Sequence, residues 1–349
     1  MKKKVAVVLF NLGGPDKLSA VKPFLFNLFY DPAIINAPRP LRYLLAKFIS
    51  TKRKKTAKEI YSHLGGRSPI LELTKLQAKQ LEKMLEKEND DYRVFISMRY
   101  WRPLAQETLK EVINWAPDES ILLPLYPQYS STTSGSSLYS WKKETEKQSF
   151  SIPTKTICCY PESEKFILAH VKSVKKILTQ VKIKYNSLSN TILLFSAHGL
   201  PEKIIKSGDP YQVQVESTVK AIVEKIEDKT LKHIICYQSK VGPLRWIRPS
   251  TEEEIIKASR DKKNIIIVPI AFVSEHSETL VELDMEYKKI AKSYGCLDYY
   301  RVPALGTNVD FIEALSDLVK LKNKNKSNIL NKKTCSKECK KCFYNVREN

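Results

Sequence analysis

The fold is decided by TILLFSAHGLP, residues 191–201. This stretch begins with a short apolar run and ends in a turn that contains glycine and proline. The run is apolar throughout, without the alternation of a strand that has one solvated face. It therefore predicts a strand buried on both faces of a parallel sheet. His198 stands where this strand ends.

Similar apolar runs recur along the chain, and amphipathic helical stretches separate them. This alternation predicts an α/β protein with parallel sheets. Splitting the runs four and four predicts two similar doubly wound, Rossmann-like domains, each with a four-stranded parallel sheet. The expected strands are residues 5–10, 93–98, 121–125, 154–159, 191–196, 233–237, 264–271 and 299–302. The expected helices are residues 73–88, 104–115, 162–180, 211–227, 251–257, 278–294 and 310–320.

With 349 residues the chain exceeds the usual size of one domain. We expect an N-terminal domain over residues 1–150, completed by the helix at 310–320. A second domain, residues 151–309, carries His198 and the helix that begins at Glu278. Residues 321–349 are expected to be a polar connector followed by a cysteine-rich tail.

The net charge of +21 comes from lysines scattered along the chain. No base-reading motif accompanies the charge, so we expect no nucleic-acid partner. An anionic membrane surface or an anionic substrate fits the charge better. No apolar run approaches the ~18 residues of a membrane span, and the first apolar run is too short for a signal peptide. The expected location is the cytoplasm, with peripheral contact at the inner membrane left open.

Histidines and carboxylates gather where predicted strands end, which is where ligands bind in doubly wound sheets. His198 follows one strand and His276 follows another. Glu278, Glu282 and Glu286 are spaced four apart, which places them in one row on a helix face. A neutral imidazole accepts protons and a carboxylate holds a divalent cation. The alternatives are a core histidine and a solvated acidic face.

The sequence shows no motif for a nucleotide cofactor or for a catalytic zinc. The turn at residues 13–15 lacks the G-x-G-x-x-G spacing, and the serine-rich loop at 126–137 lacks a Walker lysine. Both features argue against a nucleotide. No cysteine or second histidine lies at zinc-site spacing beside His198, which argues against a permanently bound catalytic zinc.

Segments in the same order along the chain resemble the ferrochelatase family. The match covers about residues 4–320 and therefore nearly the whole chain. The resemblance implies a chelatase-like fold and a lyase that inserts ferrous iron into protoporphyrin IX to form protohaem, the terminal step of haem biosynthesis. The segments are FNLGGP (10–15), GGRSPI (65–70), MRYWRP (98–103), YPQYSSTTSGSS (126–137), LLFSAHGLP with KSGDPY (193–211), QSKVGPLRW (238–246) and VPIAFVSEHSETLVELDMEY (268–287).

The resemblance also implies roles for individual residues. His198 takes protons from the pyrrole nitrogens, and Glu278 faces it across the porphyrin; both would touch the substrate iron. Glu282, Glu286 and His276 would form the iron path. The expected porphyrin-binding residues are Leu12, Arg53, Tyr61, Ser68, Arg99, Tyr100 and Trp246.

The resemblance leaves several points open. Leu12 favours protoporphyrin IX, because relatives that act on coproporphyrin tend to carry tyrosine there. Residues 23–49 resemble an apolar lip through which some members rest on a membrane. A homodimer is left open. The alternatives are a chelatase for another metal or tetrapyrrole, such as a coproporphyrin iron chelatase or a cobalt chelatase, and a non-enzymatic tetrapyrrole-binding protein.

The tail TCSKECKKC carries Cys335, Cys339 and Cys342. Its placement resembles the C-terminal extension whose cysteines bind a 2Fe–2S cluster in some ferrochelatases. Such a cluster takes four thiolates, and we expect the fourth from Cys158, or from Cys159 beside it. Structural zinc and an unliganded tail are the alternatives.

Overall fold

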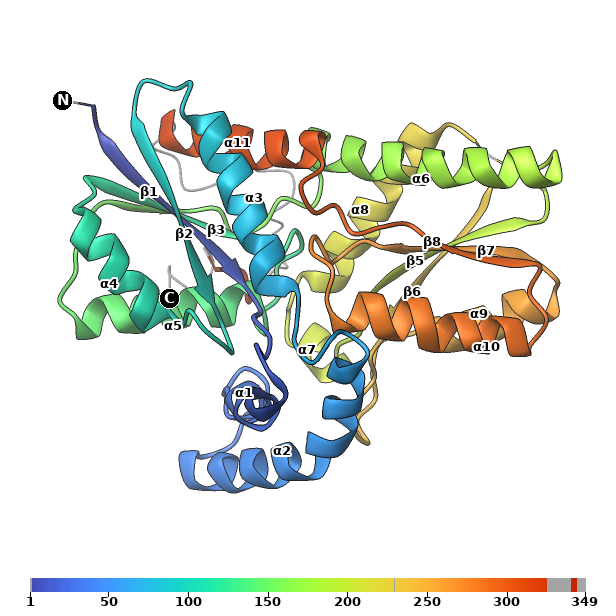
Figure 1. Cartoon of the computed structure of the whole chain (residues 1–349), viewed down its shortest axis with the longest axis horizontal. Helices are drawn as coiled ribbons and strands as arrows, with labels where there is room; N and C mark the ends of the chain where they lie inside the picture. The colour runs from blue at the N-terminus through green and yellow to red at the C-terminus, as the bar shows by residue number, and fades with distance from the viewer. Residues whose placement is uncertain (1, 229, 325–339, 344–349) are drawn as a thin grey trace. The chain divides into compact units, whose positions relative to one another are not determined.

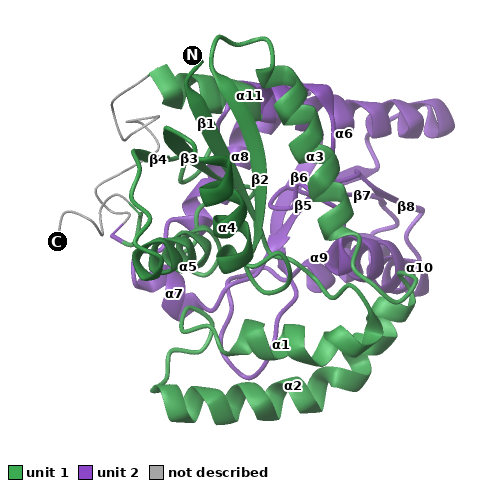
Figure 2. Cartoon of the chain, turned by 60° about the vertical axis from the view of Figure 1, so that its left-hand side comes forward, with its two compact units in different colours: residues 1–160, 315–336, 341–349 green, residues 161–314, 337–340 purple. Residues whose placement is uncertain are grey.

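The structure, a computed structural model, describes residues 2–228, 230–324 and 340–343. They form two compact units, each with a four-stranded sheet (Figures 1 and 2). The first unit contains the chain up to Tyr160 with residues 315–324 and 341–343, and the second contains residues 161–314 with Lys340. All strand pairs are parallel. The predicted fold class is therefore confirmed.

The first sheet has the strand order β2-β1-β3-β4 and the second has the order β6-β5-β7-β8. The strands are β1 (Lys4–Asn11), β2 (Asp91–Met98), β3 (Glu119–Pro124), β4 (Thr154–Thr156), β5 (Thr191–His198), β6 (Lys232–Gln238), β7 (Asn264–Pro269) and β8 (Asp298–Arg301). The helices are η1 (Leu18–Ala20), α1 (Val21–Phe29), α2 (Arg39–Ser62), α3 (Ile70–Leu85), α4 (Ala105–Trp115), α5 (Ser134–Lys147), α6 (Glu164–Tyr185), α7 (Glu202–Lys206), α8 (Tyr211–Ile226), α9 (Thr251–Arg260), η2 (Glu278–Tyr287), α10 (Lys288–Ser293) and α11 (Val309–Lys324).

Helices cover both faces of the first sheet. On one face, Leu109 of α4 and Trp141 of α5 pack in one cluster with Val8 of β1. Helix α3 lies on the opposite face (Figure 1). Every residue of β1 after Lys4 is consequently buried. Burial on both faces explains why the strands are apolar throughout.

The second sheet is covered in the same way. Leu194 of β5 and Ile267 of β7 pack with Ile255 of α9 and Leu283 of η2. Helices α6 and α8 lie on the other face (Figure 1). Because β5 lies inside the sheet, its last residue, His198, pairs with the end of β6 and extends beyond the end of β7, which pairs with Ser196.

The boundary between the units differs from the predicted one at residue 150. The first unit continues to Tyr160, because β4 pairs with β3 and so belongs to the first sheet. The helix expected at residues 310–320 is predicted to belong entirely to the first domain. In the structure, only the part of α11 from Leu315 onward belongs to the first unit.

Helices α1, α2 and α5 were not anticipated. Helix α2 begins after Pro38, with a second proline in its first turn, where a missing N–H costs nothing. The apolar lip expected over residues 23–49 includes the first part of α2, where Leu44 and Phe48 are 61% and 65% exposed. Among the described residues, no helix is long and apolar enough to cross a membrane.

The helix expected over residues 278–294 is formed, but its first part is a π-helix, η2, that continues as α10. A π-helix has i→i+5 hydrogen bonds, is rare, and occurs frequently at functional sites.

Candidate active site

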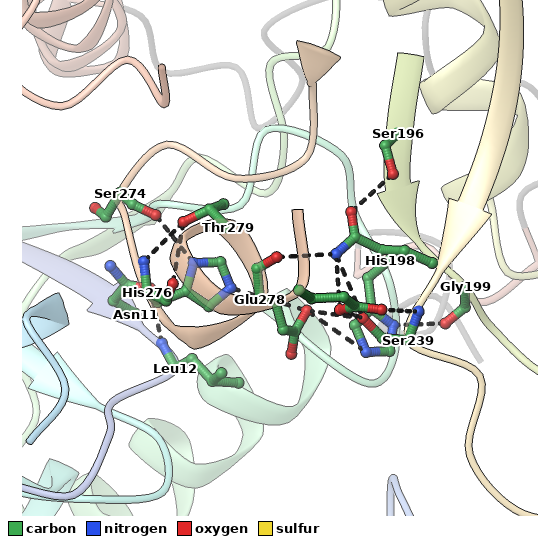
Figure 3. Close-up of polar contacts among 12 residues, drawn as sticks. Asn11, Leu12, Ser196, His198, Gly199, Ser239, Ser274, His276, Glu278 and Thr279 are labelled. Carbon is green, nitrogen blue, oxygen red and sulfur yellow. Dashed lines mark hydrogen bonds and ion pairs between the residues drawn. The ribbon is translucent and has the colours of Figure 1, made fainter. Parts of the chain in front are cut away.

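His198 ends β5 and is paired in register with Gln238, the last residue of β6. Its Nδ1 lies 2.6 Å from the carbonyl oxygen of Gly199 (Figure 3). A carbonyl oxygen only accepts hydrogen bonds, so Nδ1 carries the proton and Nε2 of the neutral ring holds a lone pair. The His198 side chain is 35% exposed. Its free nitrogen is therefore placed to accept a proton.

Gly199 and Trp246 pack beside His198. The centroids of the His198 and Trp246 rings are 6.0 Å apart. A Cβ atom on Gly199 would lie 2.9 Å from the Trp246 ring and 3.0 Å from the carbonyl oxygen of Gln238. Only glycine fits this close approach.

Glu278 is the first residue of η2 and lies between two imidazole rings (Figure 3). Its Oε2 is 3.8 Å from Nε2 of His198 and 3.8 Å from Nε2 of His276. A macrocycle does not fit between atoms this close, so the expectation that Glu278 faces His198 across the porphyrin is wrong: the two groups lie side by side. His276 is buried, and its Nδ1 donates to the carbonyl oxygen of Ser274 at 3.1 Å. In both rings Nδ1 carries a proton, and both Nε2 atoms lie near the same carboxylate oxygen.

Opposing effects act on the pKa of Glu278. Burial raises this pKa, but the positive charge of His198 when that ring is protonated and the contact with His276 outweigh burial, so the pKa falls to about 2. Glu278 is therefore ionised at neutral pH.

Glu282 is held by hydrogen-bond donors on every side. Its Oε1 accepts from the Ser239 N–H at 3.0 Å and from the Tyr287 hydroxyl at 3.0 Å. Its Oε2 accepts from the Ser239 hydroxyl at 2.6 Å and from Nε2 of Gln238 at 3.0 Å. Burial, and then the charge of Glu278, raise the pKa of Glu282.

Glu286 differs from the other two glutamates, because it is exposed. Within the described chain it has no hydrogen bond or ion pair. Of the three glutamates, Glu278 is ionised, Glu282 is held by hydrogen bonds, and Glu286 is solvated.

Sequence reasoning missed Gln238, Ser239 and Tyr287. Gln238 and Ser239 follow β6 directly, inside a segment that had been recognised as a motif. Pairing the predicted strands at 191–196 and 233–237 so that their ends are level would have placed Gln238 and Ser239 beside His198.

In the first unit, Arg99 and Tyr100 meet a buried carboxylate, Asp31, that the sequence analysis did not single out. Nη2 of Arg99 and the Tyr100 hydroxyl each lie 2.8 Å from Oδ2 of Asp31. Nε of Arg99 donates to the Ser136 hydroxyl at 2.6 Å, and that hydroxyl donates to Asp31. Tyr100 is 1% exposed. Arg99 is thus compensated within its own unit.

The other predicted porphyrin-binding residues of the first unit have varied surroundings. Leu12 packs against the cluster that contains Tyr61, and Tyr61 is buried. Ser68 is buried and lies so close to Gly14 that a Cβ there would come within 2.5 Å of it. Arg53 is exposed, 5.8 Å from the centroid of the Phe29 ring.

Three of the expected cluster ligands are described, all in the first unit. Cys158 and Cys342 are buried, and the sulfurs of Cys158 and Cys159 are 3.7 Å apart. Cys335 and Cys339 lie outside the described residues. Within residues 2–228, 230–324 and 340–343, no group of three or more His, Cys, Asp or Glu side chains is arranged to hold a metal ion.

The chain is similar to known proteins over nearly its whole length. The model of the ferrochelatase family matches residues 4–323. A ferrochelatase from Pelagibacter ubique is 55% identical over 97% of this chain and 98% of its own. One from Rickettsia bellii is 51% identical, over 98% of this chain and 95% of its own. The solved structure of SirB from Bacillus subtilis with Fe3+ shares the fold, with a TM-score of 0.52 and 12% identity over 93% of this chain and 96% of its own.

We expect Glu278→Gln to lower the free energy of unfolding by roughly 1–3 kcal/mol at neutral pH. The pKa of Glu278 is about 2 in the folded protein, whereas an unfolded glutamate titrates at ~4.3. Its ionised form therefore stabilises the fold above ~4.3, and this contribution is lost as the pH falls toward about 2. Urea unfolding of the variant and the parent from neutral to acid pH measures the difference. Glu286→Gln is the control, and equal losses at both positions would contradict the assignment.

Proposed function

Because the chain belongs to the ferrochelatase family, whose members insert ferrous iron into a porphyrin in haem biosynthesis, we propose that His198 and Glu278 carry out the proton transfer of this reaction. The protein is a lyase with ferrous iron and a porphyrin as substrates. We propose protoporphyrin IX as the porphyrin, because the side chain at Leu12 is apolar. The comparisons do not favour a chelatase for another metal or a non-enzymatic binder.

The observation that carries the proposal is the position of Nε2 of His198, 3.8 Å from Oε2 of Glu278. Nδ1 is already occupied by the Gly199 carbonyl, so a proton arriving at the ring goes to Nε2. The resulting imidazolium lies beside an ionised carboxylate, which stabilises it.

Iron insertion exchanges two pyrrole protons for Fe2+. Each N–H bond that breaks leaves a nitrogen lone pair for the metal, and the proton must go to a base within reach. His198 accepts the two protons in turn at Nε2 and releases each to solvent, to which 35% of its side chain is exposed. Trp246, packed beside it, offers an apolar surface of the kind that a flat macrocycle needs.

We assign the iron path to Glu286, Glu282, His276 and Glu278. Glu286 is exposed and attracts a cation from solvent. Glu282 is fully engaged by neutral donors and therefore contributes charge rather than a ligand bond. Glu278, which keeps its negative charge, is the carboxylate that meets Fe2+.

His198→Ala should lower kcat for iron insertion by ~100-fold or more, because a positioned general base contributes about that much. The assay follows haem formation by absorbance from protoporphyrin IX and ferrous iron under anaerobic conditions. His233→Ala is the matched control, since His233 is exposed on β6 of the same unit. Near-normal turnover of His198→Ala, with a normal circular dichroism spectrum, would show that His198 is not the proton acceptor.

We also propose that the tail binds a 2Fe–2S cluster through Cys335, Cys339, Cys342 and Cys158, with Cys159 as the alternative fourth ligand. Cys342 is buried and Phe343 packs against the core of the first unit, so this part of the tail is docked. Lys322 is buried; burial lowers its pKa, and the charge of a Cys158 thiolate opposes this shift. A cation beside thiols favours the thiolate that a cluster requires. Bound there, the cluster would cross-link the tail to the first unit.

Iron and acid-labile sulfide per chain, with zinc measured in parallel, test the cluster. Cys342→Ser should bleach the visible absorbance and lower the yield of soluble protein, because metal binding is linked to folding. Cys296→Ser is the control, as Cys296 packs against the core of the second unit. If zinc is found without sulfide, the tail binds a structural zinc and not a cluster. If neither iron nor zinc is found, the tail is unliganded.

We further propose that α2 rests on an anionic membrane surface. Leu41, Leu44 and Phe48 are 51%, 61% and 65% exposed, and their spacing places them on one side of the helix. Lys47 and Lys52 flank them and are also exposed. An apolar face bordered by lysines is typical of interfacial helices.

The double variant Leu44→Ser and Phe48→Ser should float poorly with anionic vesicles, because it loses the apolar part of the contact. The parent protein should bind less as salt rises, since screening weakens the lysine contribution. Flotation measures both effects. Ile183→Ser on α6, where Ile183 is 75% exposed, is the control. Unchanged flotation of the double variant would contradict the proposal.

A further inference from the structure

Ser239 directly follows β6 and has a φ of +64°, in the left-handed region. Glycine adopts this conformation freely, whereas a side chain makes it costly. Gly242, in the same loop, has a φ of +73° and carries no such strain. The strain at Ser239 is offset by the hydrogen bonds of its side chain and its backbone.

Ser239 binds the carboxylate of Glu282 through two donors, its backbone N–H and its hydroxyl. The Ser239 N–H donates to Oε1 of Glu282 at 3.0 Å, and the hydroxyl donates to Oε2 at 2.6 Å. The same hydroxyl lies 3.5 Å from Oε2 of Glu278 (Figure 3). The hydroxyl is therefore placed between two carboxylates of η2.

Gln238 anchors the turn on both sides. Its Nε2 reaches Oε2 of Glu282 at 3.0 Å and the carbonyl oxygen of Glu278 at 3.3 Å. Its Oε1 accepts from the Ser196 hydroxyl at 2.7 Å, inside β5. The turn after β6 thus ties the beginning of η2 to the strand that carries His198.

Two neighbouring carboxylates repel each other unless donors lie between them. We propose that Ser239 is a positioning residue, whose hydroxyl holds Glu282 and thereby keeps Oε2 of Glu278 facing His198. This role rests on the proposed function, because it concerns the same proton transfer. Without the hydroxyl, Glu278 moves away from the imidazole rings while the strands and the apolar core remain.

Ser239→Gly separates positioning from stability. It removes the hydroxyl, keeps the N–H to Glu282 and relieves the backbone strain. We expect kcat to fall ~10- to 100-fold while KM for the porphyrin stays within ~2-fold, since a displacement of about 1 Å costs that much. Ser239→Ala lacks the hydroxyl but keeps the strain, and it should lose kcat equally. A loss in Ser239→Ala alone would make the role one of backbone stability and overturn the proposal.

The chain offers a matched control in Ser149, which is exposed and has a φ of +50° after α5 in the first unit. Ser149→Gly relieves the same kind of strain and removes no bond to a carboxylate. It should leave kcat unchanged. If Ser239→Gly behaves like Ser149→Gly, the positioning role is wrong.

A second measurement does not depend on turnover. In protein with labelled histidines, the nitrogen-15 resonances of His198 and His276 report the carboxylate beside each Nε2. Ser239→Gly should shift both toward their positions in Glu278→Gln, and unmoved resonances would overturn the proposal. A parent protein that forms no haem would contradict the proposed function, whereas the resonances would still decide the role of Ser239.

Discussion

The second unit's site depends on one atom, Oε2 of Glu278, which lies 3.8 Å from Nε2 of each of two imidazole rings. Burial alone would favour a protonated Glu278, but the two rings outweigh it and bring its pKa to about 2. Each ring is oriented by a backbone carbonyl that accepts from Nδ1. The pKa of Glu278 therefore stays this low only while both rings keep their orientation.

That arrangement depends in turn on the parallel sheet. β5 lies between β6 and β7, so His198 and Gln238 end their strands side by side. The helix that follows β7 begins with Glu278, beside the same strand ends. Hydrogen bonds from Gln238 and Ser239 then hold the beginning of the π-helix η2, where Glu278 and Glu282 lie about one helical turn apart. A binding site at the carboxyl ends of strands is the general property of such sheets.

The first unit balances charge differently. Arg99 and Tyr100 converge on Asp31, which is buried and compensated there by a guanidinium and two hydroxyl groups. Arg53, by contrast, keeps an exposed guanidinium. The resemblance names both arginines as porphyrin-binding residues, but it gives no sign of Asp31, because Asp31 lies far from Arg99 along the chain.

The sequence by itself determined the α/β class, the two parallel sheets and the strand-end histidine, because these follow from local hydrophobic pattern and turn residues. It also singled out Glu278, since the residue types and motifs around it are local. Only the tertiary structure decided which partners each side chain meets: Ser239 and Gln238 at Glu282, Asp31 at Arg99, and β4 in the first sheet. It also decided that η2 is a π-helix and that α2 leaves Leu44 and Phe48 exposed. These outcomes depend on pairing and burial between distant segments, and periodicity within one segment carries no information about them.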